Sequence, residues 1–80
     1  MYKITDEVYV NGSVDHTRSQ EAFDREEMLI IVSATLSYFY GNVFTFGDCV
    51  EKFIITVRKD KKTLFSHTVD VAGIKQLIWE

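Results

Sequence analysis

Apolar and polar residues follow different patterns at the two ends and in the middle of this chain. Residues 2–10 are rich in β-branched and aromatic side chains, which is typical of a strand. Asn11 and Gly12 follow, and this pair favours a two-residue type I′ turn because both positions need a positive φ. The pattern predicts an N-terminal β-hairpin. We expect its returning strand to be short, since residues 15–17 lead directly into a helix start.

A long apolar segment occupies the middle of the chain. Thr17 and Gln20 resemble a helix-capping box, and no Gly, Pro or Asn occurs over residues 18–40. Gly41 suits the position after the last helical residue, where a left-handed backbone is common. These signals predict one helix over residues 18–40, with most of its circumference apolar and buried.

A strand over the later part of that segment is the alternative. Residues 32–38 alternate apolar and polar side chains, as a half-buried strand does. Gly41 and Asn42 would then form a two-residue turn into residues 43–46. We favour the helix for residues 29–40, because a change to strand without a breaker is unusual. The sequence leaves this choice open.

Residues 52–58 and 63–71 predict a second antiparallel hairpin. A three-residue loop over residues 60–62 gathers the apolar side chains of both strands on one face. The residues opposite one another are then Val57 and Phe65, Ile55 and His67, and Phe53 and Val69.

A short helix is predicted over residues 71–79. Asp70 is its candidate N-cap, and the spacing turns Ile74, Leu77 and Ile78 inward. The fold class is therefore α+β. We expect a small single domain over residues 1–80, with an N-terminal β-hairpin, one long helix, a C-terminal antiparallel hairpin and a short terminal helix.

The core must come largely from the middle of the chain, because no charged residue lies between Glu27 and Asp48. A domain of 80 residues buries only about 60–65% of its unfolded surface, so a partner subunit would help to hold the fold. The uncharged run is about as long as a membrane span. It contains several Ser, Thr and Asn residues, however, and no Lys or Arg flanks it, so we expect no span.

Charge and cysteine content narrow the class of protein. The formal net charge is −3, with one basic segment over residues 58–62, which is not the profile of a general DNA-binding protein. Cys49 is the only cysteine and cannot form an internal disulfide, so we expect a buried, reduced thiol. No basic-then-apolar leader opens the sequence, and we expect a cytoplasmic protein.

No group of residues has the spacing of a catalytic or cofactor site. Ser66 precedes His67 directly, and on a strand these two side chains point to opposite faces. Two histidines and one cysteine far apart in sequence do not suggest a metal site, and no glycine-rich phosphate motif occurs. We therefore expect a protein that is not an enzyme, with no cofactor, no metal and no small-molecule substrate.

Aromatic residues are dense for so small a protein. Packing in the core is their ordinary role, but a chain of this size has difficulty burying five neighbouring rings and Trp79. We expect at least one or two of them to be exposed or covered by another chain, where aromatic rings are effective anchors. The candidate anchors are Tyr38, Tyr40, Phe44 and Phe46.

Two charged groups are further candidates for partner binding. The basic hairpin tip could contact phosphates or an acidic protein surface, although its ordinary role is to solvate the tip and protect sheet edges. It consists of Arg58, Lys59, Lys61 and Lys62. The acidic helix start, with Glu21 and Asp24, could steer a basic partner or simply solvate the first turn.

As a profile only, this acidic, motif-free α+β chain resembles the small phage or plasmid proteins that inhibit host machinery, anti-CRISPR proteins among them. The resemblance implies a non-catalytic protein-binding module that occludes a site on a larger protein. One alternative is a homo-oligomeric structural subunit, such as a homodimer, built on the same aromatic residues. Another is weak nucleic-acid contact through the basic hairpin tip.

Overall fold

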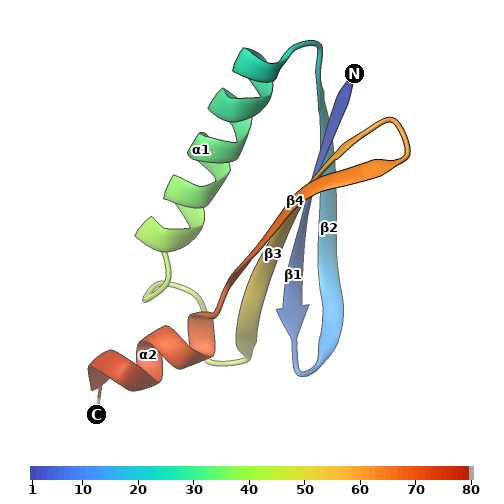
Figure 1. Ribbon diagram of the computed structural model, residues 1–80. Helices are drawn as coiled ribbons and strands as arrows, with labels where there is room; N and C mark the ends of the chain where they lie inside the picture. Colours follow the sequence, from blue (N-terminus) through green and yellow to red (C-terminus); the bar gives the residue numbers. More distant parts are fainter. Residues whose placement is uncertain (80) are drawn as a thin grey trace.

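The computed structural model describes residues 1–79, with side chains through Ile78, so the side chain of Trp79 lies outside the described part. Four antiparallel strands form one sheet in the order β2-β1-β3-β4, and two helices accompany it (Figure 1). The predicted α+β class and its succession of elements are confirmed. The elements are β1 (Tyr2–Val10), β2 (Ser13–Ala22), α1 (Arg25–Gly41), β3 (Val50–Lys59), β4 (Lys62–Val69) and α2 (Val71–Trp79).

The N-terminal hairpin has the predicted turn but a longer second strand. Asn11 and Gly12 have φ angles of 51° and 84°, as a type I′ turn requires. The prediction of a short returning strand and of a helix start at Thr17 is wrong. β2 pairs with β1 as far as Ala22, because an edge strand can expose polar side chains and needs no apolar alternation.

Helix α1 begins further along the chain than predicted, at an N-cap whose hydrogen bonds resemble those of a capping box. Asp24 Oδ1 accepts the backbone N–H of Glu27 at 2.8 Å, and Glu27 Oε2 accepts that of Phe23 at 3.3 Å. Residues 29–40 are helical, so the strand alternative is wrong. Gly41 is the last helical residue and not a left-handed residue beyond it, since the C-cap is Asn42 with a φ of −116°.

The second hairpin has the predicted register but a different loop. The three pairs from Val57 with Phe65 to Phe53 with Val69 are all present. Lys59 lies opposite Lys62, however, so the turn has two residues, and Asp60 adopts a φ of 57°. The extra residue that the apolar register requires is a bulge at Leu64 within β4.

The core lies between one face of the sheet and a narrow strip of α1. Phe39 stacks on Phe53 of β3, with ring centroids 4.2 Å apart and an interplanar angle of 6°. Only Val32, Thr35 and Phe39 of α1 are buried. The prediction that most of the helix circumference is buried is therefore wrong, because a single helix covers the middle of a four-stranded sheet and leaves its own flanks exposed.

Helix α2 contributes only its first turns to the core. Asp70 Oδ1 accepts the backbone N–H of Gly73 at 3.0 Å, which confirms the predicted cap, and Val71 is fully buried. Ile74 is half-buried, but Leu77 and Ile78 are exposed, contrary to prediction. The reason is that α2 projects past the end of the sheet (Figure 1), where no strand lies beneath its later residues.

Neither α1 nor α2 lies on the other face of the sheet. A row of four hydroxyl groups crosses it, from Ser19 through Thr5 and Thr56 to Ser66. The hydroxyls of Thr5 and Ser19 are 3.3 Å apart, and those of Thr56 and Ser66 are 3.5 Å apart. Cys49 lies in the segment before β3 and is exposed, so the expectation of a buried thiol is wrong.

Candidate protein-binding groove

A groove of about 580 Å³ runs between α1 and β2, and we name it the α1–β2 groove. Phe39 and Phe53 lie at its base. Its helical wall consists of Ile30, Ala34 and Tyr38, which are spaced four residues apart and therefore lie on one flank of the helix. Ile30 is 63% exposed and Tyr38 is 56% exposed. The helical wall is therefore an apolar surface open to solvent.

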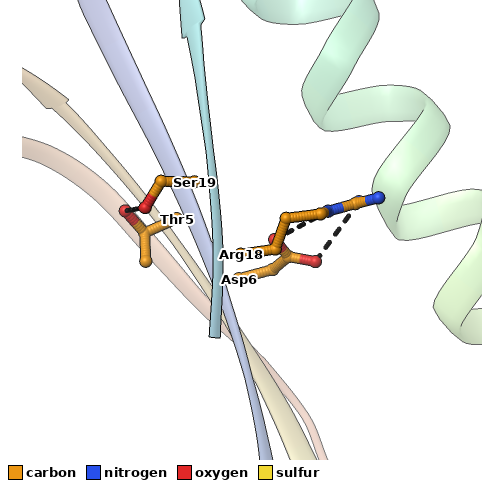
Figure 2. Close-up of polar contacts among 4 residues, drawn as sticks. All are labelled: Thr5, Asp6, Arg18 and Ser19. Atoms are coloured by element: carbon orange, nitrogen blue, oxygen red, sulfur yellow. Dashed lines mark hydrogen bonds and ion pairs between the residues drawn. The ribbon is translucent and has the colours of Figure 1, made fainter. Parts of the chain in front are cut away.

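The opposite wall is polar and comes from the edge strand β2, through His16, Arg18 and Gln20. Figure 2 shows Arg18 reaching from β2 toward α1, beside Asp6, while Thr5 and Ser19 lie on the other face of the sheet. Arg18 Nη2 is 3.3 Å from Asp6 Oδ2, and Arg18 Nε donates to Asp6 Oδ1 at 3.4 Å.

The two members of this ion pair differ in burial. The Asp6 side chain is only 10% exposed, whereas the Arg18 side chain is 53% exposed. Asp6 stands among apolar residues on the helix side of β1, so Arg18 neutralises a carboxylate that the core would otherwise disfavour. A guanidinium has five N–H donors, and the two contacts with Asp6 leave others directed toward the groove or solvent.

Two of the predicted aromatic anchors belong to this groove. Tyr38 and Phe46 pack edge to face, with ring centroids 6.2 Å apart. Phe46 also contacts Phe53, at 4.8 Å between centroids, and is half-buried. The expectation that at least one or two of the neighbouring rings are exposed is confirmed, since Tyr38, Tyr40 and Phe44 all are.

The other two predicted anchors lie elsewhere. Tyr40 is on the opposite flank of α1, where its hydroxyl is 2.7 Å from His67 Nε2 of β4. Phe44 lies in the segment after α1 and borders a shallow hollow with Lys75 of α2. The four predicted anchors therefore do not form one surface.

The predicted charged residues also lie away from the α1–β2 groove. Asp24 is the N-cap of α1, which is a structural role. Glu21 lies near the end of β2, opposite Lys3. In the basic tip, Lys59 Nζ lies over the Tyr2 ring at 5.1 Å from its centroid. The remaining members of the basic tip, all exposed, are Arg58, Lys61 and Lys62.

Sequence reasoning missed Ile30, Ala34, His16 and Arg18 as possible site residues. The four-residue spacing of Ile30, Ala34 and Tyr38 was available as a signal. It was obscured because nearly all of α1 is apolar, so no flank stands out. His16 and Arg18 could not be placed while their segment was assigned to a helix start.

Within residues 1–79, no three His, Cys, Asp or Glu side chains are placed to hold a metal ion together. Nor does any helix in this part of the chain have the length and apolar character needed to cross a membrane. Comparison with protein-family models, curated proteins and solved structures finds no match to this chain.

Proposed function

We propose that this chain is a non-catalytic protein-binding module that uses the α1–β2 groove to dock on a larger protein and occlude a site there. The observation that carries the proposal is the exposed apolar wall of Ile30 and Tyr38 beside a concave base. Exposed apolar and aromatic groups around a hollow are typical of interaction sites.

The chemistry of the groove favours one kind of occupant. Its apolar wall and base suit a segment with apolar side chains, whereas Arg18 offers N–H donors at the opposite wall. A segment with apolar residues and a carboxylate would satisfy both, since carboxylates pair well with a guanidinium. We therefore infer that the partner presents an amphipathic, acidic segment to the groove.

The charged groups outside the groove have a secondary role in this proposal. The basic hairpin tip of Arg58, Lys59, Lys61 and Lys62 would attract an acidic partner and accelerate encounter. Glu21 and Asp24 lie at the same end of the sheet, since Tyr2 pairs with both Ala22 and Lys59, and they would restrict the orientation in which such a partner approaches. The class of small phage or plasmid inhibitors, anti-CRISPR proteins among them, is part of the proposal by analogy of size, acidity and lack of catalytic motifs.

Affinity capture from an extract of the source organism, followed by mass spectrometry, tests the proposal. The test variant is Ile30→Ser, and its matched control is Ile78→Ser on α2. These two isoleucines are 63% and 61% exposed, so both variants remove the same side chain at nearly the same exposure. We expect one specific protein to be captured by the wild type and by Ile78→Ser, and lost with Ile30→Ser.

A titration with the purified partner then measures the contribution of Ile30 to the binding affinity. We expect Ile30→Ser to weaken affinity by roughly tenfold or more, as for a buried apolar anchor. The wild-type chain should also block an activity or an interaction of that partner. Equal capture by both variants, or capture of no specific protein, contradicts the assignment of the groove.

A further inference from the structure

The outer edge of β4 is open and carries no charge along most of its length. β4 is the last strand of the sheet and is hydrogen-bonded only to β3. From Thr63 to Val69 it has no charged residue, with Lys62 before this run and Asp70 after it. An uncharged edge strand can pair with a strand of another chain.

The other edge of the sheet differs in this respect. β2 carries Asp15, Arg18 and Glu21 along its length. Charged side chains distributed along an edge discourage pairing with other strands. β4 is therefore the edge that is suited to association.

The helix side of β4 adds exposed aromatic surface. Phe65 is exposed and lies parallel to the ring of His67, with an interplanar angle of 5° and centroids 6.4 Å apart. His67 in turn contacts the exposed Tyr40 of α1. These three rings form a continuous aromatic strip beside the open edge, on the flank of α1 opposite the α1–β2 groove.

We propose that β4 pairs antiparallel with β4 of a second copy of this chain, about a two-fold axis at Ser66. The partner is a second copy because the edge is complementary to itself. A two-fold axis at Ser66 brings the Lys62 end of each β4 beside the Asp70 end of the other. It thus brings opposite charges near one another at each end of an uncharged run, with the bulge at Leu64 lying between Lys62 and the regular pairs around the axis.

The register follows from the two faces of the sheet. Directly opposite residues of antiparallel strands lie on the same face, so only some registers keep both α1 helices on one side. The axis at Ser66 places Phe65 of each copy opposite His67 of the other, and both side chains lie on the helix side. The aromatic strips of the two copies then cover each other, and the two sheets form one continuous sheet of eight strands.

Ser66 also provides a sharp test. A residue on a two-fold axis lies opposite its own copy, so Ser66→Lys brings two positive charges together and Ser66→Glu two negative charges. The matched control is Ser19→Lys, because Ser19 ends the same hydroxyl row on the opposite edge strand. Both serines are exposed and each contacts one threonine hydroxyl.

Sedimentation velocity of the purified wild type and variants, from about 1 to about 500 µM, measures the association. Circular dichroism confirms that each variant is folded. We expect the mass of the wild type and of Ser19→Lys to rise with concentration from 9.3 kDa toward twice that value. Ser66→Lys and Ser66→Glu, each measured separately, should associate at least tenfold more weakly than the wild type. An equimolar mixture of the two should regain the dimer.

Three results would overturn the proposal. The first is a wild type that stays at 9.3 kDa throughout. The second is an equal effect of Ser66→Lys and Ser19→Lys, and the third is a mixture that fails to associate. The measurement needs no other protein, and Ile30→Ser should dimerise like the wild type. The dimer and the proposed function can therefore fail separately.

Discussion

Two carboxylates illustrate how single residues shape this fold. Asp24 is the N-cap of α1. Its side chain accepts the backbone N–H of Glu27, which has no partner within the first helical turn. Asp6 lies in the apolar layer between sheet and helix and depends on Arg18 for its counter-charge. For each carboxylate, a prediction distinguishes the loss of its specific contact from the loss of a negative charge alone.

We expect Asp24→Ala to lower the free energy of unfolding by about 1 kcal/mol, the usual loss for an N-cap. The control is Glu26→Ala, which also removes an exposed acid from the first turn of α1. It should cost less than about 0.5 kcal/mol. Urea denaturation of both variants measures the difference. Equal losses would mean that net charge, and not the cap, accounts for the effect.

We expect substitutions of Asp6 and Arg18 to have non-additive effects on the free energy of unfolding. Arg18→Leu leaves the largely buried carboxylate without its partner and should cost about 1–3 kcal/mol of unfolding free energy. The double variant Asp6→Val with Arg18→Leu removes both charges and should return close to the wild type. Chemical denaturation of Asp6→Val, Arg18→Leu and the double variant gives the coupling free energy between the two side chains. A double variant as unstable as Arg18→Leu alone would contradict this account.

At the scale of elements, the sequence predicted a feature correctly wherever backbone geometry or strand pairing allowed only one arrangement. Asn11 and Gly12 predicted the first turn because few other residues accept a positive φ at both positions. The faces of β3 and β4 predicted their register, because a shift by one residue would mix apolar and polar side chains. The loop length was wrong, since a bulge at Leu64 can supply the same offset as a third loop residue.

The sequence was insufficient where the structure depends on a surface that no other element covers. β2 has no apolar alternation, so its pairing with β1 could not be read from residues 15–22. Leu77 and Ile78 have the spacing of a buried face, and only the projection of α2 past the sheet exposes them. The α1–β2 groove was missed for the same reason, because an apolar flank does not reveal whether another element covers it.

Helix α2 supports a prediction at this scale. Val71→Ala should cost about 2 kcal/mol of unfolding free energy, because this side chain is fully buried beside Phe53 and Val69. Leu77→Ala, on the exposed part of the same helix, should change it by less than about 0.5 kcal/mol. Urea denaturation checks both. A large loss for Leu77→Ala would mean that α2 packs against the domain along its whole length.

The whole molecule is more open than its size requires. Its radius of gyration is 13.4 Å, whereas a compact chain of this length has about 12 Å. Its accessible surface is 5460 Å², against about 5,000 Å² for a typical monomer of this mass. One helix covering a four-stranded sheet and a second that projects from its end account for both differences (Figure 1). The uncovered apolar surface is what both proposals use.

The central claim is that one flank of α1 is apolar and open to solvent, although the helix is packed on the sheet. Hydroxyl-radical labelling of the purified chain, read out by mass spectrometry at low micromolar concentration, tests it at two neighbouring rings. Tyr38 is 56% exposed and Phe39 is 3% exposed. The account predicts that Tyr38 is modified many times faster than Phe39. Equal protection of both rings in the monomeric chain would contradict it.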